Sequence, residues 1–358
     1  MRRLLIIGFG IAILVSGCRS MGPAALSRDR FDYTLAISDS VKNQALLNMV
    51  KIRYGDVPIF VDVSSVISQY LLENDISYGF GWTYSTPSAT MPTTMRSPSI
   101  GGITRYAERP TISYSPLTGE KFTKSMLTPI PPSAIIFLVQ SGKSVDAIFY
   151  LCVQSVNGIK NRYDGPMRSI PINPDFVELL TRMRRIQQSG MLGMRVQVAE
   201  NKQATVFYFS KEMSPEIAED VAWVKQKLGL NPQSWEFKVV YGSVTQQDEI
   251  AILSRSMMEI LVQQSSAIDI PAEDIQQNRA YAVAKTEDPL AELMSVHVRS
   301  GKEKPADAFV SISYRDKWFW IEDTDFRSKQ LFSGVILLLS LMEADKGANQ
   351  PVITVPTG

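Results

Sequence analysis

The sequence predicts an α+β protein, with a helix-rich N-terminal lobe followed by mixed hairpin–helix–strand units with antiparallel sheet. Three observations indicate this class. Apolar residues recur at helical spacing before residue 165, short stretches alternate between apolar and polar residues after it, and helix start signals separate those stretches. With 358 residues, of which 45% are hydrophobic, the chain is long enough for two lobes with their own cores.

The chain begins with the pattern of a signal peptide over residues 1–17. Arg2 and Arg3 form a basic start, and the apolar stretch Leu4–Val15 follows. That stretch is too short for a bilayer span, which needs about 20 apolar residues. The pattern therefore indicates export, with removal of this segment from the mature protein.

The end of this segment resembles the lipobox of bacterial lipoproteins, in which an aliphatic residue and two small residues precede a cysteine. The residues here are Leu14-Val15-Ser16-Gly17-Cys18. The resemblance implies acylation of Cys18 by fatty acids such as palmitate, cleavage before it, and a lipidated tether over residues 18–30. Several acyl chains hold a protein firmly at a membrane, whereas one holds it marginally. The alternative is an ordinary secretory signal with a cysteine near the cut.

The residue after Cys18 bears on the destination. In Gram-negative lipoproteins an Asp at that position commonly retains the protein at the inner membrane, and Arg19 stands here. We therefore expect an outer-membrane protein facing the periplasm, held by its N-terminal lipid. Loss of residues 1–17 changes the formal net charge from +1 to −1, so no basic footprint for nucleic acid is expected.

The N-terminal lobe is expected over residues 31–165. A long loop rich in Ser, Thr, Pro and Met, with flanking strands, is predicted over 85–108, and a hairpin tip is the alternative structure. It serves either as a binding loop or as a dispensable insertion. The other predicted elements are a helix from Asp39 or Ser40 to Tyr54, strands at Ile59–Val63 and Thr111–Tyr114, and helices at Glu120–Leu127, Ser133–Ser141 and Val145–Val156.

The C-terminal lobe is expected over residues 166–358, after a loop that contains Gly158, Gly165 and Pro166. Two hairpin–helix–strand units are predicted in it, joined by a bridging helix. The elements are a helix from Asn173 or Asp175 to Gln188, strands Met194–Val198 and Thr205–Phe209, a helix from Ser214 to near Gly229, strand Trp235–Tyr241, the bridging helix Gln247–Gln264, a hairpin of Leu293–Val298 with Ala308–Ser313, strand Trp318–Ile321, a helix Phe326–Glu343 and strand Val352–Val355.

Cysteine and histidine are too few for most site chemistry. With Cys18 acylated, Cys152 has no intramolecular partner, and its apolar surroundings favour a buried, inert thiol over a nucleophile or an intermolecular disulfide. The one histidine, His297, excludes a multi-histidine metal site. We therefore expect no metal and no cofactor.

Two groups of residues are candidates for an interaction surface. Arg182 and Arg185 lie on the polar face of a predicted helix, where they either meet solvent or dock an anionic partner. Trp318 and Trp320 alternate with Phe319 along a predicted strand, so one face is core and the other is a candidate partner surface. Core packing alone is the alternative for the tryptophans.

Four carboxylates are the candidates if the protein is an enzyme. Glu322, Asp323 and Asp325 precede a predicted helix, where capping and the helix dipole favour carboxylates. Asp62 lies within the predicted strand Ile59–Val63. An enzyme acting on an envelope polymer would need at least two of them at acid/base separation in a polar cleft. A carrier of lipid or a small apolar ligand would instead need a large apolar cavity.

Three further runs resemble a family of uncharacterised bacterial lipoproteins. They are Val57–Val63, Arg109–Gly119 and Asp325–Lys329. The likeness covers most of the mature chain and implies secretion and lipidation without implying an activity. The leading expectation is a non-enzymatic lipoprotein with a structural or assembly role and an envelope protein as its partner.

Overall fold

The computed structural model describes residues 23–67, 70–82, 96–108, 111–166, 169–199, 202–243, 246–282, 288 and 290–343. Its helices and mixed sheets confirm the predicted α+β class. The chain forms two compact units, one of Met1–Phe60 with Thr118–Gly358 and one of Val61–Leu117. The signal peptide, Cys18 and the predicted strand Val352–Val355 lie outside the described residues.

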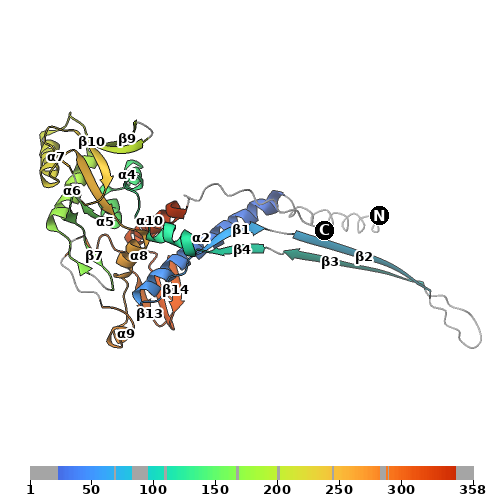
Figure 1. The fold of residues 1–358 in the computed structure, drawn as a ribbon. Coiled ribbons are helices and arrows are strands. Elements are labelled where there is room, and N and C mark those ends of the chain that lie inside the picture. The colour runs from blue at the N-terminus through green and yellow to red at the C-terminus, as the bar shows by residue number, and fades with distance from the viewer. Residues whose placement is uncertain are drawn as a thin grey trace, which may run out of the picture. The chain divides into compact units, whose positions relative to one another are not determined.

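The larger unit contains most of the elements (Figure 1). Its helices are α2 (Pro23–Arg53), α3 (Gly119–Phe122), the π-helix η2 (Thr123–Leu127), α4 (Pro132–Gln140), α5 (Val145–Cys152), α6 (Pro174–Gln188), α7 (Pro215–Lys227), α8 (Met257–Ser265), α9 (Ala272–Gln276) and α10 (Phe326–Glu343). Its strands are β5 (Val153–Val156), β6 (Ile159–Lys160), β7 (Tyr163–Asp164), β8 (Ser169–Ile170), β9 (Leu192–Ala199), β10 (Lys202–Phe209), β11 (Glu236–Tyr241), β12 (Glu249–Ser254), β13 (Arg299–Gly301), β14 (Val310–Tyr314) and β15 (Lys317–Ile321).

A six-stranded sheet lies at the centre of this unit. Its strand order is β6-β5-β12-β11-β10-β9, and every neighbouring pair is antiparallel except β11 with β12. Helix α6 packs against α5, α7 and β9. Phe176 and Leu179 of α6, Phe237 of β11 and Ala251 of β12 are fully buried, so this layer of helices and the sheet share one apolar core.

The rest of the unit is organised around α2. A three-stranded antiparallel sheet has the order β13-β15-β14, and α2 packs against β14, α8 and α10. Leu46 and Met49 in the last part of α2 are fully buried, whereas Phe31 and Leu35 in its first part are exposed. Among the described residues, no helix is both long enough and apolar enough to cross a membrane.

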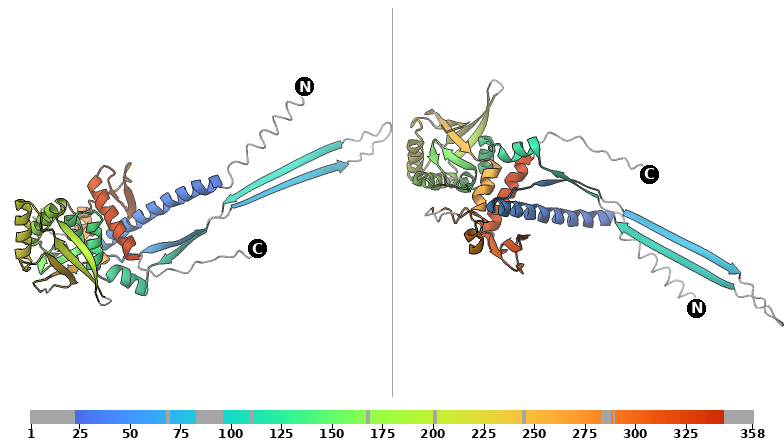
Figure 2. Two further views of the ribbon diagram at one scale, coloured as in Figure 1. Left: turned by 90° about the horizontal axis from the view of Figure 1, so that it is seen from above. Right: turned by 60° about the horizontal axis from the view of Figure 1, so that its bottom comes forward.

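The smaller unit consists of paired strands. β1 (Val61–Ile67) pairs with β4 (Thr111–Pro116), and β2 (Tyr70–Trp82) pairs with β3 (Arg96–Glu108), all antiparallel. Both views of Figure 2 show β2 and β3 side by side along their whole length. The loop predicted over 85–108 is therefore wrong for residues 96–108, which form β3, while its first part, 85–95, lies outside the described residues.

The division into two lobes at residue 165 also needs correction. β5, before that position, pairs with β12, after it, so one sheet spans the predicted boundary. The boundaries instead flank Val61–Leu117. Local composition does not reveal this arrangement, because strand pairing between distant segments decides which residues share a core.

Four element predictions are corrected as well. The first helix begins at Pro23 rather than near Asp39, so part of the predicted tether is helical. Residues 153–156 and 249–254, predicted as helix, are β5 and β12, because they pair with each other inside the sheet. The predicted strand Leu293–Val298 is not a strand, because the chain turns there and only Val298 forms an isolated bridge, with Ile268. The predicted hairpin is therefore wrong, and β14 pairs with β15 instead.

Candidate functional site

Among the strand pairs of the described residues, that of β2 with β3 has the longest register. Each strand has 13 residues, and the register runs without a shift from Tyr70 opposite Glu108 to Trp82 opposite Arg96. At about 3.4 Å per residue each strand is roughly 40 Å long, whereas strands of 5–6 residues are typical. The neighbouring β1–β4 pair, by contrast, has a register shift between Val63 and Ser65.

The two faces of this hairpin differ in composition. Residues two apart in a strand share a face, and directly paired residues share it too. One face takes the apolar-rich set, and the other takes the polar and small residues. From β2 the first set is Tyr70, Leu72, Asn74, Ile76, Tyr78, Phe80 and Trp82, and the second is Leu71, Glu73, Asp75, Ser77, Gly79 and Gly81. This alternation, already visible between residues 70 and 82, is the signal that the sequence interpretation missed.

Within the part of the chain that the structure describes, each strand of the hairpin has one edge without a neighbouring strand. Among the described residues the sheet of β2 and β3 contains no third strand. In an antiparallel pair each strand directs alternate N–H and C=O groups away from its partner, and such an edge is a template for a further strand. A sheet of two strands is marginally stable in water by itself. The hairpin is therefore a candidate interaction element.

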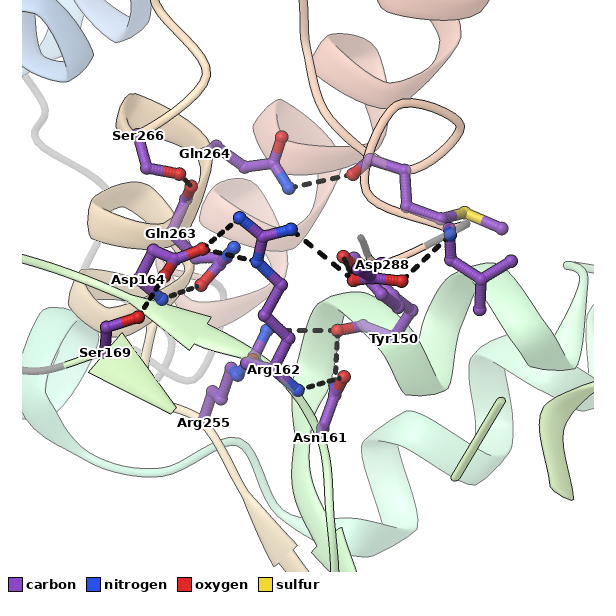
Figure 3. Close-up of polar contacts among 12 residues, drawn as sticks. Tyr150, Asn161, Arg162, Asp164, Ser169, Arg255, Gln263, Gln264, Ser266 and Asp288 are labelled. Atoms are coloured by element: carbon purple, nitrogen blue, oxygen red, sulfur yellow. Dashed lines mark hydrogen bonds and ion pairs between the residues drawn. The ribbon is translucent and has the colours of Figure 1, made fainter. Parts of the chain in front are cut away.

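A second candidate is a buried polar cluster in the larger unit (Figure 3), formed by Tyr150, Arg162, Asp164, Arg255 and Asp288. Arg162 pairs with Asp164, and its Nη1 lies 3.7 Å from Asp288 Oδ2. Tyr150 donates a hydrogen bond of 2.9 Å from its hydroxyl to the same Asp288 oxygen. The cluster thus links α5, β7 and the segment that precedes β13.

Arg255 completes the polar cluster through backbone oxygens. Its Nη1 donates to the carbonyl oxygens of Tyr150 at 3.0 Å and Leu151 at 3.2 Å, and its Nη2 donates to the carbonyl of Arg162. Burial lowers the pKa of the Arg255 guanidinium, and burial together with the charge of Asp288 raises the pKa of Tyr150. The Asp288 side chain is 0% exposed, so we assign the polar cluster a structural role and not contact with a substrate.

A third candidate is an apolar groove along α10, with a volume of about 720 Å³. We call it the α10 groove. Its charged lining residues, Lys143, Arg327 and Lys329, are all cations, and Lys329 pairs with Asp323 at 2.7 Å. Its apolar lining residues are Leu138, Ala147, Ile148, Leu151, Leu293, Met294, Phe309, Phe326, Leu331, Leu337 and Leu338. A groove of this size and lining could accept an apolar chain with an anionic end.

The predicted tryptophans lie on β15, the central strand of the three-stranded sheet. Phe319 between them is fully buried and contacts the ring of Tyr54, with ring centroids 6.0 Å apart. Trp318 and Trp320 share the opposite face and are half-buried, and Lys304 Nζ lies 5.4 Å from the Trp318 ring. The predicted alternation is confirmed, and a partner surface at the two tryptophans stays a prediction.

The predicted arginines of α6 are both engaged with α7. Arg185 donates from Nε to Asp220 Oδ2 at 2.7 Å and from Nη2 to Oδ1 at 2.6 Å, and Arg182 Nη1 donates to Oδ1 at 2.8 Å. The guanidinium of Arg182 also lies 4.9 Å from the ring of Trp223. The hydrogen bond from Arg185 lowers the pKa of Asp220, although burial opposes this. The arginines therefore join two helices of the fold.

The carboxylates before α10 are each engaged locally. Glu322 pairs with Arg299 at 3.0 Å, and Asp323 pairs with Lys329. Asp325 caps α10, because it accepts from the backbone N–H of Ser328 at 3.0 Å and from its hydroxyl at 2.7 Å. Asp62 lies on β1 in the smaller unit. The three carboxylates near α10 therefore do not form the free acid/base pair that the enzyme hypothesis needs.

The structure describes only one of the two cysteines. Cys18 lies outside the described residues, so its acylation stays a prediction. Cys152 at the end of α5 is fully buried, and this burial raises the pKa of its thiol to about 12. Because the thiolate is the reactive form, the position favours the inert thiol that the sequence predicted.

Known proteins offer no guide to these candidates. No protein-family model, no curated protein and no solved structure matches the chain.

Proposed function

We propose that this protein is an outer-membrane-anchored periplasmic lipoprotein with an assembly role in the cell envelope, in which the β2–β3 hairpin is the arm that pairs with another envelope component. The observation that carries the proposal is the pair of free edges along a hairpin of two 13-residue strands. Backbone groups along such an edge supply affinity when a further strand adds to it. The lipobox at Cys18 supplies the anchor in this proposal.

The lipid anchor and the arm have separate tasks. A protein of near-neutral charge has little electrostatic attraction for a membrane surface, so the acyl chains of Cys18 would hold it there. The hairpin belongs to a compact unit of its own, Val61–Leu117. We therefore expect loss of the hairpin to abolish partner binding while the larger unit still folds.

The test is photo-crosslinking in cells. A photoreactive residue replaces Tyr78 on the hairpin, and the matched control places it at Phe137, an exposed residue of α4 in the larger unit. Mass spectrometry then identifies the crosslinked products. We expect one or two envelope products from position 78 and none of them from position 137.

Two further variants complete this test. Cys18→Ala removes the anchor, and we expect it to release the protein from the membrane and to abolish the same products. Replacing residues 70–108 by a short turn should leave a folded, membrane-bound protein without a partner. Identical products from positions 78 and 137, or only abundant envelope proteins from both, would contradict the proposed role of the hairpin.

The α10 groove favours a second function, a carrier of an amphipathic lipid. Its lining combines apolar side chains with cations and contains no carboxylate. Extraction of the purified full-length protein, followed by lipid mass spectrometry, tests this function. Leu337 lines the groove and is exposed, so Leu337→Glu places a charge at its opening. The carrier function predicts a bound lipid in the native protein and none in this variant. Recovery of equal amounts of lipid from the two proteins would contradict it.

A further inference from the structure

We infer that the partner of the hairpin is a second copy of this chain, with β2 of one copy pairing antiparallel with β3 of the next. This inference rests on the proposed function, since it names the strand that adds to the arm. As far as the described residues extend, the hairpin has two different edges without a strand neighbour, one on β2 and one on β3. A neighbouring copy that presents its β3 edge to β2 leaves its own β2 edge free for another copy.

The charges on the two strands favour this pairing over a two-fold one. β2 carries Glu73 and Asp75 and no basic residue, while β3 carries Arg96 and Arg105 together with Glu108. Pairing β2 with the β3 of a neighbour places an acidic strand beside a basic one. Pairing β2 with β2 would place acidic strands side by side, and opposed like charges destabilise a sheet.

Within one chain, β2 and β3 already pair antiparallel, so the same two sequences can also pair between copies. Glu73 lies opposite Arg105 within the hairpin. The same antiparallel register between copies would repeat this opposition at every new interface. A shift of the register by two residues would keep each residue on its face, whereas a shift by one would exchange the faces.

The alternation of the strands explains why further copies would stabilise the hairpin. Each added copy extends the apolar-rich face, which contains Ile76, Tyr78 and Phe80, into a continuous apolar surface on one side of a larger sheet. Three or more strands with an apolar face are stable where two are marginal. Pro98 has no backbone N–H, so β3 has one donor fewer near the Trp82 end of the hairpin.

The contact between copies would be heterologous, because β2 meets β3 and not itself. Repetition of a heterologous contact gives a ring if the rotation between copies closes, and an open chain if it does not. The inference therefore predicts assemblies of more than two copies. A dimer with two equivalent strands at its interface is excluded by the same geometry.

The first experiment uses two variants of the full-length lipidated protein, each with one added cysteine and its own tag, in which Cys18 is acylated and Cys152 is buried. Ser77→Cys marks β2, and Ser99→Cys marks β3, opposite Gly79 within the hairpin. Cells that express either variant or both are treated with a short bis-maleimide. We expect a crosslinked product with both tags from cells that express the two variants together, and no crosslinked dimer from cells that express either variant alone.

Each other outcome of this experiment decides a specific point. If cells that express only Ser77→Cys gave as much crosslinked product as cells that express both variants, β2 would pair with β2. Such a two-fold contact would overturn the pairing of β2 with β3. Absence of any copy-to-copy product, while position 78 still captures a different envelope protein, would overturn this inference and leave the proposed function standing. Absence of every product from the hairpin would overturn both.

The second experiment exchanges the charges of the two strands. The swapped chain carries Glu73→Arg, Asp75→Arg, Arg96→Glu and Arg105→Glu, so opposite charges still meet within the hairpin and between swapped copies. We expect swapped chains to crosslink with each other as well as unswapped chains do. In the register of the hairpin, a mixed pair opposes like charges at one position, residue 73 opposite residue 105, and we expect about threefold less product from mixed pairs. Equal yields from mixed and matched pairs would show that the strand charges do not direct the contact.

Discussion

Tyr150 donates a hydrogen bond of 2.9 Å to Asp288, which ties α5 to a residue 138 positions later in the chain. Both residues are buried, and Arg162 lies beside the same carboxylate. Such a contact stabilises the fold mainly because its loss leaves a buried carboxylate with one donor fewer. The hydrogen bond from Tyr150 is the first of four structural features whose contribution can be tested by substitution or labelling of the purified protein.

Tyr150→Phe removes this donor without changing the packing of the ring. We expect the free energy of unfolding to fall by about 1–3 kcal/mol, measured by urea denaturation at neutral pH. Tyr241→Phe, on the exposed end of β11, is the matched control and should change it by less than about 0.5 kcal/mol. Equal effects of the two variants would show that the hydroxyl of Tyr150 does not contribute to stability.

Arg162→Met removes the cation between Asp164 and Asp288. Two buried carboxylates then lose their ion-pair partner, and we expect a loss of about 3–5 kcal/mol in the free energy of unfolding. Arg299→Met breaks an exposed pair with Glu322 and should cost at most about 1 kcal/mol. If the two substitutions cost the same in urea denaturation, the polar cluster does not have the structural role assigned to it.

Asp220→Asn tests the helix contact of α6 with α7 through its pH dependence. The pKa of Asp220 is lowered in the folded protein, chiefly by the hydrogen bond from Arg185. Its stabilisation is therefore complete above the unfolded pKa of about 3.9 and is lost as the pH falls through the lower folded value. We expect Asp220→Asn to cost about 3 kcal/mol at pH 7 and progressively less below about pH 4.

The control for this pH dependence is Glu236→Gln. It removes an exposed pair with Arg195, in which each side chain is 49% exposed, and should change stability by less than about 1 kcal/mol at pH 7. Urea denaturation across the pH range gives both curves. A constant difference between the native protein and Asp220→Asn at every pH would show that the carboxylate charge is not the source of its effect.

Cys152 should resist thiol reagents in the folded protein. Burial raises its thiol pKa to about 12, so almost no thiolate exists at neutral pH, and the side chain is fully covered. We expect no maleimide labelling of Cys152 in the folded protein and complete labelling in denaturant. Mass spectrometry measures the labelled fraction. Ser340→Cys, on an exposed position of α10, is the positive control. Native labelling of Cys152 at the rate of the control would contradict the buried position.

Several elements were predictable because their signals are local. Asn173 caps α6 by accepting from the backbone N–H of Asp175, and Ser214 caps α7 by accepting from Ile217. Pro174 and Pro215 begin those helices, as their fixed backbone angle favours. In each case the few residues that form the cap also lie next to one another in the sequence.

Elements whose state depends on a distant partner were predicted poorly. The run Ile250-Ala251-Ile252-Leu253 is apolar and short, so periodicity does not distinguish a buried strand from a helix. It is a strand because β5 and β11 lie on its two sides in the sheet. Residues 96–108 were predicted as loop because they belong to a run rich in Ser, Thr, Pro and Met, and their pairing with β2 makes them a strand.

For the candidate sites too, local features were predicted well and contacts between distant residues were not. The sequence identified Arg182 and Arg185 as a basic group but gave no partner for them, and Asp220 is reached only when α7 packs on α6. It likewise identified Asp325 as a helix cap, which the structure confirms through Ser328, three residues away. The polar cluster around Arg162 could not be predicted, because its members lie far apart in the chain.

The α+β class, the caps of α6, α7 and α10, the alternation of Trp318, Phe319 and Trp320, and the apolar surroundings of Cys152 were all predictable from the sequence alone. These features depend on residues within one or two turns of each other, where local geometry and solvation decide. Three contacts could be read only from the folded chain: the pairing of β2 with β3 without a register shift, the binding of both arginines to Asp220, and the hydrogen bond from Tyr150 to Asp288. Those contacts join segments far apart in the chain, and burial of the whole core, not any local preference, selects them.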